Sequence, residues 1–285
     1  MIKLALTDLD NTFIPLAGIA TEYARRAMHT ALDAGMRVGP VTGRVPAAMR
    51  WMFANDERCF ATGAFVNGQI IYVDGAIVRE QTIDGELLEE VGRYVRDCEG
   101  VALALCDITR VTGASDGAIS YLGITASELA RHGTFFGDEY RLINHVDLPS
   151  YIKCNLRCDL PPEQVAALQE DLRARFGELT FVLPMNGGQF IDILPAGWDK
   201  GKAVRFLMDY LNLADDEVVV FGDSDNDLAM LGAVPHSVTV ANAAPEVRAA
   251  SRWHIGACDD DAVARALLDI VDANARGTTP AFMRV

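Results

Sequence analysis

The sequence predicts an α/β protein, in which a doubly wound parallel sheet is interrupted by an inserted α+β domain. Short apolar segments alternate with helical segments at both ends of the chain, which is typical of a parallel sheet covered by helices. Between about Thr82 and Met185 this alternation stops. The chain has 285 residues, half of them hydrophobic, which is enough for two domains. We expect residues 1–81 and 186–285 to form one domain and residues 82–185 the other.

The first elements are two βα units. Ile2–Thr7 is a short apolar strand, and Thr21–Ala34 has helical periodicity with a stop signal at Gly35. Next we expect a strand, a helix, a third strand and a small hairpin: Met36–Val41, Ala47–Ala54, Phe60–Thr62 and Asn67–Val73. Strands that alternate with helices in this way favour parallel pairing.

The inserted segment has a different pattern from its flanks. It contains two helices, Glu86–Asp97 and Pro162–Phe176, and two alternating segments, Val101–Cys106 and Tyr151–Cys158. The βα alternation resumes at Asp199. There we expect, before the closing helices, a helix, a strand, a second helix and a second strand: Lys200–Leu211, V-V-V-F up to Gly222, Asp225–Leu231 and Val238–Ala241. The first domain is therefore predicted to be discontinuous in sequence.

The charge of the chain limits its partners. A formal net charge of −15 and a pI near 4.7 argue against binding to nucleic acid or to an anionic membrane, because both require clustered Lys and Arg. No apolar stretch is long enough to span a bilayer, and Lys3 and Asp8 interrupt any signal-peptide core. We expect a cytoplasmic protein with no nucleic-acid or membrane partner, whose oligomeric state the sequence leaves open.

Six cysteines are too few and too scattered for a disulfide scaffold, so we expect free thiols. Cys154 and Cys158 have the spacing of a metal-binding pair. In the sequence, however, they alternate with apolar residues such as Leu156, which predicts the inward face of a strand. We therefore assign them to the core.

Polar side chains gather where three predicted strands end. They are Asp8 and Asp10 after the first strand, Thr42 and Arg44 after the second, Asp223, Asn226 and Asp227 after V-V-V-F, and Lys200 opening the preceding helix. In open α/β sheets, ligands bind beyond the carboxyl ends of the strands. Two carboxylates about 4 Å apart repel by roughly 4 kcal/mol at an effective dielectric near 20, so the cluster needs a cation.

A hard divalent cation with oxygen ligands satisfies this need. Mg²⁺ prefers one or two carboxylates, waters and a phosphate oxygen, and Lys200 and Thr42 would hold the remaining phosphate oxygens. The chemistry that this arrangement favours is phosphoryl transfer, in which positioning and charge neutralisation supply most of the catalysis.

The motifs D-L-D-N-T, V-T-G-R, the K-G of D-K-G-K and G-D-S-D-N-D resemble, in this order, the four motifs of the haloacid dehalogenase superfamily. The resemblance covers nearly the whole chain. The insert between the second and third motifs is similar to the class II, type B cap of Cof-type phosphatases. The resemblance implies a Rossmann-like core, a cap that governs substrate selectivity, and hydrolysis of a small phosphorylated metabolite such as a sugar phosphate or a phosphorylated cofactor.

The resemblance also implies a role for each matching residue. Asp8 would be the nucleophile that forms an aspartyl-phosphate, and Asp10 the general acid and base. Mg²⁺ would be held by a carboxylate oxygen of Asp8, the backbone carbonyl of Asp10 and the carboxylate of Asp223, with support from Asp227. The phosphoryl group would be bound by Thr42 and Lys200, with Asn226 close by.

Several alternatives stay open at this stage. A phosphomutase of the same superfamily shares both aspartates, and a phospho-acceptor module or a catalytically silent phosphate-binding protein would use similar residues. A dehalogenase lacks the second acid, so Asp10 argues against it. G-W-D-K-G-K-A does not have the spacing of a P-loop. Arg44 either belongs to the site or only pairs with a carboxylate, and Gly39 and Pro40 predict an irregular second strand.

Overall fold

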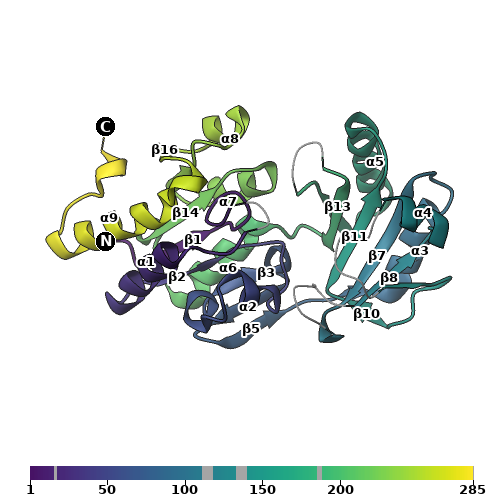
Figure 1. The fold of residues 1–285 in the computed structure, drawn as a ribbon, viewed down its shortest axis with the longest axis horizontal. Coiled ribbons are helices and arrows are strands. Elements are labelled where there is room, and N and C mark those ends of the chain that lie inside the picture. The colour runs from purple at the N-terminus through teal and green to yellow at the C-terminus, as the bar shows by residue number, and fades with distance from the viewer. Residues whose placement is uncertain (16–17, 111–117, 133–139, 185–187, 285) are drawn as a thin grey trace. The chain divides into compact units, whose positions relative to one another are not determined.

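A five-stranded parallel sheet forms the centre of the unit that contains both chain ends (Figure 1). The structure is a computed structural model and describes residues 1–15, 18–110, 118–132, 140–184 and 188–284. Its core unit comprises Met1–Glu80 and Asp199–Val285, and its inserted unit comprises Gln81–Trp198. The sheet in the core unit confirms the predicted α/β fold class.

The strand order of this sheet brings the predicted site residues together. The order is β16-β15-β14-β1-β2. The strands are β1 (Leu4–Thr7), β2 (Arg37–Pro40), β14 (Val218–Gly222), β15 (His236–Thr239) and β16 (Trp253–His254). β1 pairs in parallel with β14 on one side and β2 on the other. The carboxyl ends of all three strands therefore meet at one edge of the sheet.

The helices of the core unit form where capping residues and apolar stripes predict them. They are α1 (Glu22–Asp33), α2 (Ala48–Met52), α6 (Lys200–Leu211), α7 (Leu228–Leu231), α8 (Pro245–Ala250) and α9 (Ala262–Arg276). The hydroxyl of Thr21 caps α1 by accepting from Ala24 N, and the carboxylate of Asp199 caps α6 by accepting from Lys202 N. α1 buries an alanine-rich stripe and packs against α9.

The second strand is regular, although Gly39 and Pro40 predicted an irregular backbone. β2 pairs with β1 without a shift in register. A Cβ on Gly39 would lie 1.6 Å from the carbonyl oxygen of Thr62, so only glycine allows the next segment to approach this closely. The predicted third strand at Phe60–Thr62 is wrong, because Glu57–Phe60 forms a 3₁₀ turn, η1. The strand, β3, begins at Gly63.

A three-stranded antiparallel sheet follows η1 in the core unit. It consists of β3 (Gly63–Phe65), β4 (Ile70–Val73) and β5 (Ala76–Glu80). The predicted hairpin at Asn67–Val73 contains only β4, whose antiparallel partners β3 and β5 lie on either side of that segment. Asp74 and Gly75, at the turn between β4 and β5, both have positive φ.

The inserted unit is built on a second, mostly antiparallel sheet of order β12-β13-β11-β7-β8-β9. Its strands are β7 (Val101–Asp107), β8 (Ala118–Leu122), β9 (Tyr140–Leu142), β11 (Lys153–Cys158), β12 (Leu179–Val182) and β13 (Phe190–Pro195). The remaining elements are the pair β6 (Ile83–Asp84) and β10 (Ser150–Tyr151) and the helices α3 (Gly85–Val95), α4 (Ala126–His132) and α5 (Pro162–Arg175). These elements give the α+β character expected of the insert.

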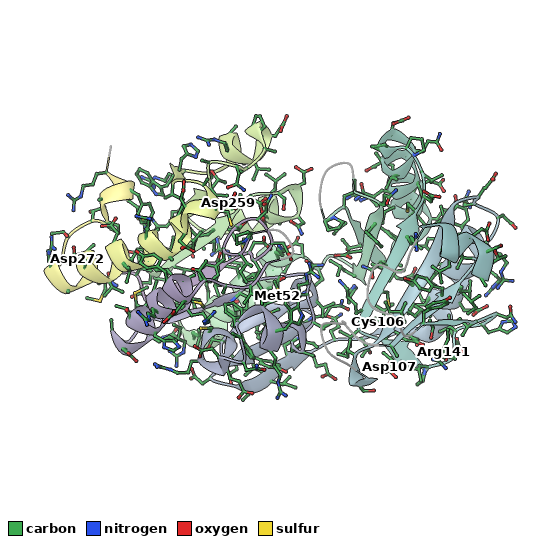
Figure 2. The ribbon with its side chains drawn as sticks, in the orientation of Figure 1. Met52, Cys106, Asp107, Arg141, Asp259 and Asp272 are labelled. Carbon is green, nitrogen blue, oxygen red and sulfur yellow. The ribbon has the colours of Figure 1, made fainter. Side chains whose placement is uncertain are left out.

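The two cysteines of β11 are buried in the apolar cluster of this unit. Cys154 and Cys158 lie with Leu156 among residues of α3 and α5, and all six cysteines of the chain are free thiols. The assignment of Cys154 and Cys158 to the core face is confirmed. Figure 2 shows Cys106 and Arg141 on strands of the same unit.

The second boundary between the units differs from the expected one. The expected break at 185/186 lies outside the described residues, and the division falls after Trp198. The reason is that β13 pairs with β11 and β12 and so belongs to the inserted sheet. The alternation in F-I-D-I-L-P predicts a strand but does not indicate which sheet it joins.

The acidic residues fall into two groups. Many are exposed, as Asp259 and Asp272 are in Figure 2. Among the described residues only four aspartates are buried, and three of them are Asp8, Asp223 and Asp227. The predicted site therefore contains most of the buried aspartates.

None of the helices in the described ranges is long and apolar enough to cross a membrane.

Candidate active site

A tight turn after β1 presents the first two aspartates. Asp8 continues the sheet, because its N–H donates to the carbonyl of Phe221 over 2.9 Å. The carbonyl oxygen of Leu9 then accepts from the backbone N–H groups of Thr12, Phe13 and Ile14, and Asn11 adopts a left-handed conformation with φ 68°. Asn tolerates this conformation better than most residues. The turn folds Thr12 back toward the sheet edge.

Lys200 lies between two of the buried carboxylates. Its Nζ is 2.6 Å from Asp8 Oδ1 and 2.7 Å from Asp227 Oδ1, and its side chain is only 2% exposed. The three residues come from different parts of the sequence, at the start of the chain, the start of α6 and the turn after β14. Lys202, two residues further along α6, is exposed. Of these two lysines, only Lys200 contacts the buried carboxylates.

Two glycines allow this close packing. A Cβ on Gly201 would lie 2.4 Å from the carbonyl oxygen of Ala229, so glycine lets the start of α6 approach the helix after β14. A Cβ on Gly222 would lie within 2.7 to 2.9 Å of three atoms of the Asp227 side chain. The glycines of the K-G and G-D motifs therefore have a steric role.

Asp223 and Asp227 are held by hydrogen bonds from different sources. Asp227 Oδ2 accepts from the backbone N–H groups of Asp223 and Ser224 at 3.0 and 3.1 Å. Asp223 Oδ1 accepts from the hydroxyl of Thr12 over 2.7 Å. Both oxygens of Asp227 are therefore occupied, whereas one oxygen of Asp223 accepts no hydrogen bond from the described residues.

The electrostatics of the cluster follow from burial. Burial raises the pKa of Asp8 well above its usual range, against the opposing charge of Lys200. Burial and the charge of Asp227 raise the pKa of Asp223 to about 6, although the Thr12 hydrogen bond lowers it. For Lys200, burial would lower the pKa, but Asp227 and Asp8 raise it above its usual value, so the ammonium stays charged.

Asp10 lies apart from the lysine and pairs with Arg44. Arg44 Nε and one terminal nitrogen donate to the two carboxylate oxygens of Asp10 at 3.0 and 2.9 Å, which is a bidentate ion pair. The hydroxyl of Thr42 accepts from the backbone N–H of Arg44 over 3.1 Å. Of the two interpretations of Arg44, the structure favours pairing with a carboxylate.

The side chains of Thr42 and Asn226 make no hydrogen bond to the described carboxylates of the cluster. Thr42 is buried at the end of β2, and Asn226 Oδ1 accepts from the hydroxyl of Ser224 over 2.9 Å. Both lie in loops that follow strands next to β1.

The carboxylates fit a hard divalent cation. One oxygen from each of Asp8, Asp223 and Asp227 lies within 4.8 Å of the other two, and all three residues are buried. A set of buried carboxylate oxygens is the donor set that Mg²⁺ prefers. Because Asp227 already uses both of its oxygens, the oxygens of Asp8 and Asp223 are the better ligands, and Asp227 would support them indirectly.

Sequence reasoning missed one residue of this cluster and left another undecided. Thr12 stands in the motif D-L-D-N-T but was assigned no role, and it connects the turn after β1 with Asp223. Its position two residues after Asp10 in that motif was the available signal. The partner of Arg44 lies 34 residues away and had no signal in the local sequence.

A doubly wound sheet with buried carboxylates and a lysine at its carboxyl edge is the arrangement expected of the haloacid dehalogenase class of hydrolases. The profile of the haloacid dehalogenase-like hydrolase family matches residues 5–267, and the chain belongs to this family. The resemblance inferred from the four motifs is thereby confirmed, as is the prediction that the protein is an enzyme.

Individual relatives match along most of their length. An HMP-PP phosphatase of Klebsiella pneumoniae is 24% identical over 274 residues, which cover 95% of this chain and 97% of the relative. The crystal structure of SMU.1108c from Streptococcus mutans has a TM-score of 0.79 at 21% identity and covers 97% of this chain and 100% of that one. BT1666 from Bacteroides thetaiotaomicron, described among phosphatases of the same superfamily, has a TM-score of 0.75 at 19% identity and covers 94% of both chains. These structures share the fold.

Proposed function

We propose that the protein is a Mg²⁺-dependent phosphatase that hydrolyses a small phosphomonoester through an aspartyl-phosphate on Asp8. The observation that carries this proposal is the ammonium of Lys200 held between the buried carboxylates of Asp8 and Asp227, with Asp223 in the same cluster. The ammonium places a positive charge beside the carboxylate of Asp8, where a phosphoryl group would meet that nucleophile.

In the first step, a carboxylate oxygen of Asp8 attacks phosphorus and the ester P–O bond breaks. Lys200 fixes Asp8 through Oδ1 and partly neutralises its charge, which favours the ionised nucleophile. The leaving alkoxide takes a proton from Asp10. Arg44 holds the carboxyl group of Asp10 in place and keeps part of its bidentate contact when Asp10 carries that proton. Arg44 is therefore a positioning residue for the general acid.

In the second step, water attacks phosphorus and gives its proton to Asp10. The bond between phosphorus and Asp8 breaks, inorganic phosphate leaves and the carboxylate is restored. A bound Mg²⁺ would supply charge neutralisation for the phosphoryl oxygens, with Asp8 and Asp223 as its protein carboxylate ligands. Thr42, Lys200 and Asn226 are proposed to bind the phosphoryl group.

The substrate is proposed to be a small phosphorylated metabolite, either a sugar phosphate or a phosphorylated cofactor. Support comes from the family and from relatives named as phosphatases, including the HMP-PP phosphatases. We propose that the inserted unit determines which phosphomonoester is preferred. A panel of sugar phosphates, pyridoxal phosphate and flavin mononucleotide would identify the preferred class.

The test of the reaction is hydrolysis of a generic aryl phosphate. We expect turnover with Mg²⁺, loss of turnover in EDTA, recovery when Mg²⁺ is restored, and no turnover by Asp8→Asn. Asp225→Asn is the matched control, because Asp225 lies in the same motif but outside the cluster. Activity that survives EDTA or Asp8→Asn would contradict the proposal, and substrate loss without release of inorganic phosphate would indicate a mutase.

A further inference from the structure

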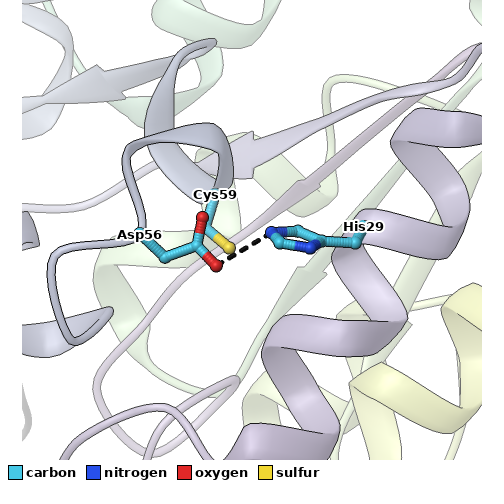
Figure 3. A group of neighbouring side chains, drawn as sticks. All are labelled: His29, Asp56 and Cys59. Atoms are coloured by element: carbon cyan, nitrogen blue, oxygen red, sulfur yellow. Dashed lines mark ion pairs between the residues drawn. The ribbon is translucent and has the colours of Figure 1, made fainter.

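A second group of metal-binding side chains lies in the core unit, on segments that contribute nothing to the carboxylate cluster. His29 projects from α1, and Asp56 and Cys59 lie at the start and within the 3₁₀ turn η1. Figure 3 shows the three side chains converging on one point. The imidazole nitrogen, one carboxylate oxygen and the thiol sulfur all lie within 4.8 Å of one another.

The backbone around η1 brings Asp56 and Cys59 onto one side of a turn. The N–H of Cys59 donates to the carbonyl of Asp56 over 3.1 Å, which closes the turn between them. Ala54 and Asn55, just before, both have left-handed φ values of 52° and 64°. A spacing of three residues in a tight turn lets two side chains bind the same ion.

His29 makes an ion pair within this group but no hydrogen bond through the same nitrogen. Its Nε2 lies 2.8 Å from Asp56 Oδ2, yet this buried nitrogen makes no hydrogen bond with any described residue. The distance is that of an ion pair, but the direction is not that of a hydrogen bond. A buried ring nitrogen without a hydrogen bond is costly, and a bound cation would satisfy it.

We propose that His29, Asp56 and Cys59 bind a divalent transition metal ion of the zinc type, at a site separate from the phosphate chemistry. Zinc takes imidazole nitrogen, carboxylate oxygen and thiolate sulfur, and three protein ligands with one water complete a tetrahedron. Donor atoms around a tetrahedral zinc ion stand roughly 3.3–3.8 Å apart, so the nitrogen–oxygen pair must open by only about 0.5 Å.

The chemistry of the donors separates this site from the carboxylate cluster. Thiolate and imidazole ligands select zinc-like ions, whereas a set of carboxylate oxygens suits Mg²⁺. Burial, with the charge of Asp56, raises the pKa of Cys59 to about 12, so the metal must displace the thiol proton. The thiolate and Asp56 together then balance the charge of a divalent ion.

Metal binding here would fasten α1 to η1. His29 lies on the helix and the other two ligands on the turn, so one ion connects two segments that are separated in sequence by the whole of β2 and α2. An ion that binds only the folded chain stabilises it by mass action. We infer a structural role for this metal ion.

The test uses Co²⁺ as a spectroscopic substitute for zinc in the full-length, untagged protein after treatment with a chelator. A thiolate–cobalt charge-transfer band in the near ultraviolet is expected at one ion per chain and should disappear when Zn²⁺ is added, but not when Mg²⁺ is added. Loss of a residue that only hydrogen-bonds to a metal ligand typically lowers metal affinity about 10–100-fold. His29 would be a ligand itself, so His29→Gln should weaken Co²⁺ binding at least about a hundredfold.

Three cysteine variants identify the thiol. Cys59→Ser should abolish the band, whereas Cys98→Ala and Cys258→Ala should keep it. Cys98 lies in the inserted unit, and the charges of Asp223 and Asp8 affect the pKa of the Cys258 thiol, so neither belongs to the proposed site. If Cys59→Ser does not fold, His29→Gln and Asp56→Asn, at partly exposed positions, decide the matter. Absence of the band in the wild type, or a band that survives both His29→Gln and Asp56→Asn, would overturn the proposal. Aryl phosphate hydrolysis does not enter this readout, so failure here leaves the proposed phosphatase untouched.

Discussion

Replacing Lys200 with methionine removes the only positive charge that contacts the carboxylate cluster within the described residues. Methionine is similar in length and fills the same space without an ammonium group. The side chain of Lys200 is 2% exposed, and its two partners Asp8 and Asp227 are 7% and 0% exposed. Solvent therefore cannot take over the neutralisation of the two carboxylates.

The magnitude follows from the two ion pairs. At separations of 2.6 and 2.7 Å, each pair contributes roughly 6 kcal/mol of Coulomb attraction at an effective dielectric near 20. Much of this is offset by desolvation of the ammonium. Removing one partner of a buried pair typically costs about 3–5 kcal/mol, because the other charge stays buried. We expect Lys200→Met to lower the free energy of unfolding of the core unit by this amount.

The assay is urea unfolding followed by tryptophan fluorescence, since Trp51 and Trp253 both lie in the core unit. Measured in EDTA near pH 7, Lys200→Met should unfold at clearly lower urea than the wild type. Adding Mg²⁺ should recover part of the difference, because a cation bound to the folded state replaces some of the lost positive charge.

Lys202→Met is the matched control, since Lys202 lies two residues away on the same helix and is exposed. It should change the free energy of unfolding by less than about 0.5 kcal/mol. The electrostatic account of the cluster is refuted if Lys200→Met stays within about 1 kcal/mol of the wild type in EDTA, or if both lysine variants lose the same stability.

Three further predictions concern Thr12, Asp223 and Arg44. Thr12→Val removes the hydroxyl that donates to Asp223, so Mg²⁺ affinity should fall about 10–100-fold, as calorimetry can measure. Burial and Asp227 raise the pKa of Asp223 to about 6, so protons compete with the metal below that pH. Mg²⁺ affinity should therefore fall up to about tenfold per pH unit below about 6 and level off above it. An affinity that does not change with pH would contradict this. Arg44→Lys loses the bidentate contact with Asp10, so kcat for an aryl phosphate should fall about 10–100-fold with KM nearly unchanged. A change in KM alone would instead indicate that Arg44 binds the substrate.

The same carboxyl group of Asp223 also affects stability in the absence of metal. Its pKa is higher in the folded than in the unfolded chain, so the folded state binds its proton more tightly. The metal-free protein should therefore lose stability as pH rises from about 4 through about 6, by roughly 3 kcal/mol from this group alone. Urea unfolding in EDTA at several pH values measures this, with Mg²⁺ expected to remove the loss near neutral pH.

Much of the candidate site was predictable, because its residues lie at positions that local sequence patterns indicate. An apolar run that ends in Asp8 or Asp223 predicts a strand with a carboxylate at its carboxyl end, and parallel strands bring those ends together. The family resemblance points to the lysine directly before a glycine, which is Lys200 before Gly201; the structure buries Lys200 and exposes Lys202. Periodicity and chain order place the carboxylates, and the motif resemblance adds the lysine.

Other features depend on which distant segments pack together, and no local pattern in the sequence indicates them. β13 has an ordinary strand pattern, but only pairing with β11 and β12 assigns it to the inserted unit. The segment Phe60–Thr62 looked like a strand because it is apolar, yet the chain needs a turn there before β3 can pair with β4.

By itself the sequence determined the alternation of strands and helices, the inserted domain and the ends of the strands that carry carboxylates. Only the tertiary structure decided that Thr12 donates a hydrogen bond to Asp223, that Arg44 forms an ion pair with Asp10, and that His29 lies beside Cys59. The physical reason is that periodicity records which face of an element is buried, whereas a contact between side chains depends on how separate elements pack and where each loop returns the chain.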